Sequence, residues 1–308
     1  MGEQAVPQLN GGWAVRRRTV ARWAGALALT ATLGCAQASN LMDPAGPRFA
    51  ADYAPGPDSV RRAGPIRVVS FNIRFAREIS RATELLRRPP LAGADLIALQ
   101  EMDDQGVDRI ARSLHLDYVY YPATIHPTTG KPFGPAILSR WPIERSWKVI
   151  LPHPSRTRGQ RRTATAAVLR IRGVAVLAYA VHLETPVQIT PSEREDQARA
   201  ILRDAASFPG PVVIAGDFNG EEIGLTMRRA GYRWLTEGVG PTVSFFNWDH
   251  IFVRHLTPAH PGPAAGVVRR IDGASDHHPV WAVLGWTPVP TPVGLPTAPG
   301  VVSVRMNR

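Results

Sequence analysis

The chain has 308 residues, of which 44% are hydrophobic, and it carries a formal net charge of +11. This length and apolar content exclude a wholly disordered chain and fit one domain of moderate size with extra segments at its ends. Residues 65–285 hold 27 Lys and Arg against 21 Asp and Glu, a net of +6. This mild excess favours an anionic substrate, although an arginine-rich surface without a special partner carries the same charge.

Residues 1–38 have the pattern of an export signal. Three arginines at positions 16–18 precede an uncharged apolar run over 24–34, which is too short to span a bilayer stably. Two ways of processing the signal fit this pattern: cleavage after Ala38, or lipid attachment at Cys35 as in a lipoprotein signal. Cys35 is the only cysteine, so no intrachain disulfide can form, and an incidental cysteine of the signal is the alternative. We therefore predict an exported protein that is periplasmic, secreted or anchored to a bacterial membrane through Cys35.

The rest of the chain divides into a linker, a domain and a tail. Residues 39–64 are rich in Pro, Gly and Ala and predict a linker, whereas the Pro-rich tail 286–308 is not expected to join a packed core. Patterns with apolar residues three and four apart predict helices over 79–88, 107–114, 192–206 and 221–230. Apolar runs predict strands over 66–71, 95–100, 118–121, 136–139, 163–170, 174–181, 212–215, 250–253 and 280–284. This mixture predicts an α/β sandwich with helices outside the sheets.

Polar side chains gather where six of these apolar runs begin or end. A buried carboxylate is unfavourable unless it is paired, hydrogen-bonded or bound to a metal. Strand ends that open into a cleft are also where sites are commonly built, so the clusters predict a hydrolytic site with a metal and a phosphate. The six motifs are Ser70-Phe71-Asn72, Leu99-Gln100-Glu101, Val181-His182-Leu183-Glu184, Gly216-Asp217-Phe218-Asn219, Trp248-Asp249-His250-Ile251 and Ser275-Asp276-His277-His278-Pro279.

In this order the motifs resemble the endonuclease/exonuclease/phosphatase superfamily, which contains pancreatic-type deoxyribonuclease, bacterial sphingomyelinases and inositol polyphosphate 5-phosphatases. The resemblance spans about Ile66 to Leu284 and includes Phe133–Arg140, which is similar to the family's Gly-x-Ala-Ile-Leu-Ser-Arg stretch. It implies a catalytic domain over 65–285. The implied fold is a four-layer αββα sandwich, with two packed, mainly antiparallel sheets flanked by helices and the site at the strand ends.

Three oxygen-bearing residues are the predicted metal ligands. Phosphodiester cleavage requires charge neutralisation on the phosphate, and hard oxygen ligands suit Mg²⁺ or Mn²⁺. Asn72, Glu101 and Asp276 supply such oxygens. The resemblance implies that Glu101 is the principal ligand and that Asn72 and Asp276 make supporting or water-mediated contacts. The alternative for Glu101 is an exposed carboxylate that merely follows a strand.

Five further residues are the predicted catalytic set. The resemblance implies that Asp217 orients or deprotonates water and that Asn219 holds a phosphate oxygen; an Asx turn is the local alternative for both. Asp249 and His277 resemble the family's Asp–His couple, in which the carboxylate fixes the imidazole tautomer. Whether His277 acts as a base or as a phosphate-binding cation stays open. His182 resembles the family's second histidine, which hydrogen-bonds the phosphate.

Other polar residues have simpler expected roles. Arg140, Arg161 and Arg162 can bind phosphate through their guanidinium groups, but a solvated surface is the expected position for most of them. His250 and His278 are expected to pack or to hydrogen-bond locally.

The whole pattern predicts an exported, Mg²⁺-dependent, nuclease-like phosphoesterase that hydrolyses phosphodiester bonds, with nucleic acid as the first substrate hypothesis. The enzymatic alternative is a phospholipid hydrolase of sphingomyelinase type, or a hydrolase of small phosphodiesters or phosphomonoesters. A binding protein without catalysis on the same fold is the remaining alternative, because a fold does not dictate a function. No protein partner is predicted.

Overall fold

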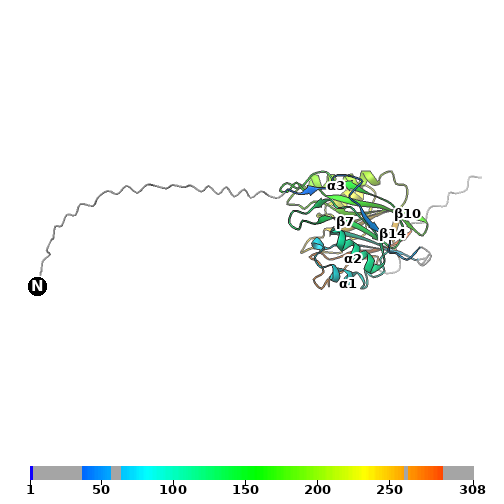
Figure 1. The fold of residues 1–308 in the computed structure, drawn as a ribbon, viewed down its shortest axis with the longest axis horizontal. Coiled ribbons are helices and arrows are strands. Elements are labelled where there is room, and N and C mark those ends of the chain that lie inside the picture. Colours follow the sequence, from blue (N-terminus) through cyan, green and yellow to red (C-terminus); the bar gives the residue numbers. More distant parts are fainter. Residues whose placement is uncertain (3–36, 57–63, 260–262, 287–308) are drawn as a thin grey trace, which may run out of the picture. The chain divides into compact units, whose positions relative to one another are not determined.

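The structure, a computed structural model, describes residues 1–2, 37–56, 64–259 and 263–286. Most of the predicted export signal, including Cys35, and residues 287–308 of the predicted tail lie outside this part. Within the described residues two β-sheets pack face to face, with α3 on one side of the strands and α1 and α2 on the other (Figure 1). None of the described helices is long and apolar enough to cross a membrane.

The larger sheet has ten strands among the described residues, and only its pair β3–β4 is parallel. Its main path runs β1, β6, β7, β4, β3, β16, β14; β15 pairs with β16, and β5 pairs with both β7 and β2. The bounds are β1 Ser39–Asn40, β2 Phe49–Ala51, β3 Ile66–Asn72, β4 Leu96–Met102, β5 Asp117–Tyr120, β6 Thr124–Ile125, β7 Pro132–Ser139, β14 Leu256–Pro258, β15 Ala265–Val267 and β16 Val280–Trp286.

As far as the structure describes the chain, the smaller sheet has six strands in the order β12, β13, β11, β10, β9, β8, of which only β10 and β11 run parallel. The predicted four-layer sandwich with two mainly antiparallel sheets is therefore confirmed. The bounds are β8 Ile143–Ile150, β9 Thr163–Ile171, β10 Val174–His182, β11 Val212–Asp217, β12 Arg233–Trp234 and β13 Asp249–Arg254.

In the described part of the chain four α-helices, all predicted, cover the outer faces of the sheets. The helices α1 and α2 pack on the larger sheet, and α3 and α4 pack on the smaller one. Side chains define two of the helix starts: Asp103 accepts a hydrogen bond from the Gly106 backbone, and Thr190 forms a capping box with Glu193. The bounds are α1 Ile79–Leu86, α2 Asp104–Leu114, α3 Pro191–Ala205 and α4 Ile223–Arg229, with a short 3₁₀ turn η2 at Arg74–Ala76.

Small and branched side chains fill the space between the two sheets. Alternate residues of a strand point to the same face, and β10 turns Ala178 and Ala180 into this layer while β11 turns Val213 and Ala215 into it. The residues between them, such as Tyr179, point to the outer helices instead. The same alternation, continued toward the strand ends, decides which polar side chains meet between the sheets.

The interpretation of residues 39–64 as a linker is wrong for residues 39–56. Two short strands, β1 and β2, add to β6 and β5 of the larger sheet. The buried Lys148 amino group also donates to the carbonyls of Leu41 and Gly46 at 2.8 and 2.7 Å. These contacts use mostly backbone groups, which need no apolar periodicity, so Pro and Gly content gave no sign of them. The domain therefore includes this segment.

Candidate active site

Four polar side chains project from strand ends into one space between the sheets. In β3, β10 and β11 every second residue points into the layer between the sheets, and continuing this alternation to the strand ends places Asn72, His182 and Asp217 on the same face. Asp249, the first residue of β13, also points to this face. None of the four is more than 2% exposed. The strand register sets His182 beside Asp217 and Asp217 beside Asp249, while Asn72 comes from the larger sheet. Ordinary strand pairing thus assembles half of the predicted site.

Glu101 reaches the site through an irregularity in β4. Leu99 faces the outer helices, so regular alternation would turn Glu101 the same way. A register shift between Leu99 and Met102 and a φ of 60° at Glu101 redirect the side chain. Its carboxylate accepts hydrogen bonds from Asn72 Nδ2 at 3.3 Å and from the Phe75 backbone N–H at 3.1 Å. Backbone strain at a non-glycine residue is characteristic of functional positions.

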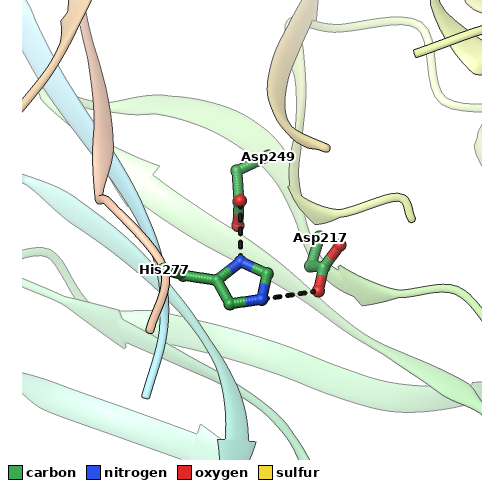
Figure 2. Close-up of side chains that lie close together, drawn as sticks. All are labelled: Asp217, Asp249 and His277. Carbon is green, nitrogen blue, oxygen red and sulfur yellow. Dashed lines mark hydrogen bonds and ion pairs between the residues drawn. The ribbon is translucent and has the colours of Figure 1, made fainter. Parts of the chain in front are cut away.

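The imidazole ring of His277 lies between two carboxylates (Figure 2). Nδ1 lies 2.9 Å from Asp249 Oδ2, and Nε2 lies 3.8 Å from Asp217 Oδ2. The Asp249 backbone N–H donates to Thr242 Oγ1, and the backbone of His277 pairs with that of Val243. The ring and its carboxylate partner are therefore fixed by the loop that precedes β13.

Burial and close charges shift the pKa of several site residues. Burial alone would lower the pKa of His277, but the carboxylates of Asp249 and Asp217 outweigh it and raise this pKa to about 10. Burial raises the pKa of Asp217 well above its ordinary value, although the charge of His277 opposes the rise. Burial also raises the pKa of Glu101, and the charge of Arg162 opposes it. The ring of His277 is thus a cation at neutral pH, and of the nearby carboxyl groups Asp217 and Glu101 have an increased proton affinity.

Two asparagines orient the carboxylate of Asp217. Asn72 Nδ2 donates to Asp217 Oδ2 at 3.0 Å, and the Asn219 backbone N–H donates to Oδ1 at 2.9 Å. The side chain of Asn219 itself donates to the Leu183 carbonyl at 2.9 Å. The turn considered as a local alternative is therefore formed, and the same backbone hydrogen bond holds both Asp217 and Asn219 at the site.

A buried arginine supports His182: Arg162 is an exception to the expectation that most of Arg140, Arg161 and Arg162 lie on a solvated surface. Its side chain is 9% exposed and donates to Glu184 through Nε and Nη2, both at 3.1 Å. Arg162 Nη1 lies 3.0 Å from His182 Nδ1. Arginine only donates, so Nδ1 must accept and the proton of the neutral ring lies on Nε2. Nε2 in turn faces Asp217 Oδ2 at 3.5 Å and Glu101 Oε1 at 4.0 Å.

The protonation state of His182 follows from the same surroundings. Burial and the positive charges of Arg162 and His277 lower its pKa well below the ordinary value, so the ring is neutral. The sequence did not reveal this ion pair. The strands β9 and β10 pair antiparallel with Ala164 opposite Val181, and that register continued outward sets Arg162 opposite Leu183 and not opposite Glu184.

The donor set around Glu101 fits a hard divalent cation. Glu101 and Asp217 are joined by the Asn72 amide, and all three side chains offer oxygens, which Mg²⁺ and Mn²⁺ prefer. The buried carboxylate of Glu101 would also gain stability from a cation, because burial opposes its charge. A second group, Asp217, Asp249 and His277, has ligand atoms within 4.8 Å of one another. Its imidazole holds a proton between carboxylates, which disfavours metal binding through that ring.

The remaining predicted residues lie at the edge of the site or beside it. Asp276 pairs with Arg74 at 3.2 Å and is 46% exposed, and its charge helps to raise the pKa of Glu101; its role as a metal ligand stays a prediction. Buried His250 accepts a hydrogen bond from Trp234 Nε1, and burial lowers its pKa to about 4. His278 bonds the backbone carbonyl of Val268. Both histidines make the local contacts expected for them.

Solved structures of several differently named proteins share this fold. The chain resembles an endonuclease/exonuclease/phosphatase from Beutenbergia cavernae (20% identity, TM-score 0.57, 72% of each chain covered). It also resembles a humanized D. rerio TDP2 (19%, 0.55) and sphingomyelinase C from Streptomyces griseocarneus (18%, 0.54), with 72% of this chain and 99% of each of the others covered. No curated protein matches the chain in sequence. At these identities the likeness establishes the fold.

Membership of a family rests on the sequence itself. The profile of the Endonuclease/Exonuclease/phosphatase family matches residues 69–277, which is more than half of the chain and includes every predicted site residue. The matched region runs from β3 to the loop before β16 and thus contains all the strand ends that meet at the site. The chain therefore belongs to the endonuclease/exonuclease/phosphatase family of hydrolases that act on phosphoester bonds.

Proposed function

We propose that the protein is an exported, Mg²⁺-dependent phosphoesterase that cleaves phosphodiester bonds in a nuclease-like reaction. One observation carries the proposal: a neutral histidine, a charged histidine and two carboxylates meet in one place, with ring nitrogens 3.5 to 4.0 Å from carboxylate oxygens. Such a set can bind an anionic phosphate, remove a proton from water and neutralise developing charge. No purely structural cluster needs all three capacities.

The two histidines, whose Nε2 atoms both lie near Asp217 Oδ2, would both bind the phosphate. His182 Nε2–H is a neutral donor, because Arg162 occupies Nδ1. His277 is a cation at neutral pH, since its pKa is raised to about 10 despite burial. This charge state supports the phosphate-binding role of His277 over the role of general base, the two alternatives that the sequence left open.

Asp217 is then the group that accepts a proton from the attacking water. Its carboxylate has both oxygens oriented, by Asn72 and by the Asn219 backbone, and burial raises its pKa toward the range useful for a general base. Asn219 would position a phosphate oxygen beside it. Glu101, with Asn72 and Asp276 in supporting positions, would hold Mg²⁺ or Mn²⁺. When bound, the metal supplies Lewis-acid stabilisation of negative charge on the phosphate.

A phospholipid or small phosphodiester is the second candidate substrate. Phe245 and Phe246, 75% and 40% exposed, stand close to Asn219 and offer an apolar surface that a polynucleotide backbone does not require. The same site would then hydrolyse a head group or an aryl ester. A binding protein without catalysis is disfavoured by the complete set of acid–base groups.

The test uses the full chain and Glu101→Gln, each with Mg²⁺, Mn²⁺ or EDTA. Plasmid DNA, RNA, sphingomyelin liposomes, bis-p-nitrophenyl phosphate and p-nitrophenyl phosphate are the substrates. We expect metal-dependent cleavage of at least one phosphodiester, lost in the variant. Inactivity of the wild-type protein on every diester would refute the proposal, and cleavage of the monoester alone would make it a phosphomonoesterase.

Export is tested separately from activity. The proposal rests on the pattern of residues 1–38, so we expect the protein to leave the cytoplasm when expressed in bacteria. Incorporation of labelled palmitate that is lost in Cys35→Ser would identify lipid anchoring, whereas a mature N-terminus at Ser39 would identify simple cleavage. Retention of the intact chain in the cytoplasm would contradict export.

A further inference from the structure

A pocket of about 680 Å³ adjoins the candidate site on the side of the smaller sheet. Three loops line it, and each loop directly follows or precedes a strand that carries a site residue. The loop after β10 contributes Thr185, Pro186 and Val187; the loop after β11 contributes residues 219–222; and the loop before β13 contributes Phe245 to Trp248. Asn219 belongs to both the site and the pocket. A group held here would therefore be joined closely to the reacting phosphate.

Aromatic rings form one wall of this pocket. Phe246 and Trp248 stack with their centroids 4.5 Å apart and an interplanar angle of 15°, and Phe245 continues the row at 4.2 Å from Phe246. Val187, 82% exposed, belongs to the same lining. Exposed apolar side chains gathered at a concave site, rather than scattered over a surface, indicate a binding function.

The aromatic wall is held rigidly to the catalytic groups. Val243 and Phe246 exchange backbone hydrogen bonds around a two-residue turn, with Phe245 at its tip. The Val243 backbone also pairs with that of His277, and Thr242 Oγ1 accepts from the N–H groups of Trp248 and Asp249. The wall is thus preformed, so a ligand would not have to order it on binding.

The charges in the pocket oppose a second phosphate. Among the described residues that line it, Arg194 is the only basic one, and its guanidinium is paired with Glu222. Glu221 is exposed at the same lining and has no basic partner there. An internal nucleotide of a nucleic acid would bring a further phosphate toward this carboxylate, which like-charge repulsion disfavours.

From the wall, the shared Asn219 and the charges, we infer that the pocket binds one ester substituent of the phosphodiester, and that this substituent is apolar or aromatic and carries no second phosphate. The inference rests on the proposed phosphodiesterase function and narrows its substrate class. Small or terminal diesters with a ring or an alkyl chain fit it, whereas internal bonds of a long polynucleotide do not.

The first test compares two diesters of p-nitrophenol on the full chain, with Mg²⁺ present. One carries methyl as its second ester group, and the other carries phenyl. We expect kcat/KM to be about tenfold higher for the phenyl ester, as stacking on two rings and burial of the ring imply. Phe246→Ala and, as a second variant at the exposed turn, Phe245→Ser should reduce this phenyl/methyl ratio toward one. Leu225→Ala removes an exposed apolar side chain on α4 that does not line the pocket, and it should leave the ratio unchanged.

The second test addresses charge. Thymidine 3′-p-nitrophenyl phosphate and its 5′-phosphorylated form differ by one phosphate, and we expect the second to react several times more slowly. Glu221→Gln should raise kcat/KM about threefold for the phosphorylated substrate and less for the other.

The outcomes separate the two proposals. Equal kcat/KM for methyl and phenyl esters in the wild type, or an unchanged ratio in both phenylalanine variants, would overturn the pocket inference while the phosphodiesterase activity stands. An equal effect of Glu221→Gln on both thymidine substrates would overturn the part that concerns a second phosphate. No hydrolysis of any diester would overturn the proposed function and this inference together.

Discussion

Replacing Arg162 should destabilise the protein strongly, because the substitution leaves a buried carboxylate without its cation. The guanidinium and the carboxylate of Glu184 are 9% and 3% exposed and share two hydrogen bonds of 3.1 Å. Arg162→Met would leave the carboxylate of Glu184 buried without its cation. Breaking a buried pair in this way costs about 3–5 kcal/mol. For a domain of this size each kcal/mol lowers Tm by about 2–4 °C, so we expect a fall of roughly 6–20 °C.

The decisive comparison is with the double variant Arg162→Met, Glu184→Gln. It removes both charges, so no uncompensated ion remains, and we expect it to recover at least half of the loss in the free energy of unfolding. Urea unfolding followed by circular dichroism gives this free energy for the wild type, both single variants and the double variant. The reasoning is refuted if Arg162→Met lies within about 1 kcal/mol of the wild type, or if the double variant loses as much as the two single variants together.

Three further predictions concern the metal, the charged histidine and the N-terminal segment. Glu101→Gln should lower metal-dependent activity at least 100-fold and abolish the rise of Tm on adding Mg²⁺. Without metal the variant should have a higher Tm than the wild type, because burial disfavours the charged carboxylate of Glu101. The pKa of His277 is raised from 6.5 to about 10, so the contribution of the charged ring to the free energy of unfolding should be complete below pH 6.5 and be lost as pH rises through 10. At pH 8, ¹⁵N NMR should show two ring N–H groups in the wild type and one in Asp249→Asn. Lys148→Met should leave two carbonyls without their donor, lower the free energy of unfolding by about 1–3 kcal/mol and speed amide exchange over residues 39–51. An unchanged exchange rate there would contradict the last of these.

Hydrophobic pattern predicted the interior of the fold well. The run 212–215 lies within β11, and 174–181 within β10, because central strands bury both faces and therefore read as continuous apolar segments. The same regularity explains why the site was accessible to sequence reasoning. His182 and Asp217 simply continue the alternation of two buried strands, and their motifs stand at recognisable strand ends.

The features that the sequence did not predict lie where the hydrophobic pattern carries little information. Strand β8 was not predicted because Glu144, Arg145 and Lys148 interrupt its apolar residues; it is the edge strand of the smaller sheet, and all of its residues except Lys148 are at least partly exposed. Arg162 was expected on the surface because a lone arginine in sequence gives no indication of its partner, and Glu184 stands 22 residues further along the chain. The redirection of Glu101 depends on one backbone angle, which no periodicity reveals.

The strands β1 and β2 determine where a shortened protein can begin. A recombinant form starting at residue 65, as composition suggested, would uncover the edges of β6 and β5 that these strands cover. Uncovered edges offer unpaired N–H and C=O groups to other molecules, so such a form should self-associate and precipitate. Processing after Ala38 would instead leave both strands intact, and of the backbone hydrogen bonds between described residues it would remove the one from the Ala38 N–H to the Arg158 carbonyl. The choice of first residue would thus decide whether a soluble sample is obtained.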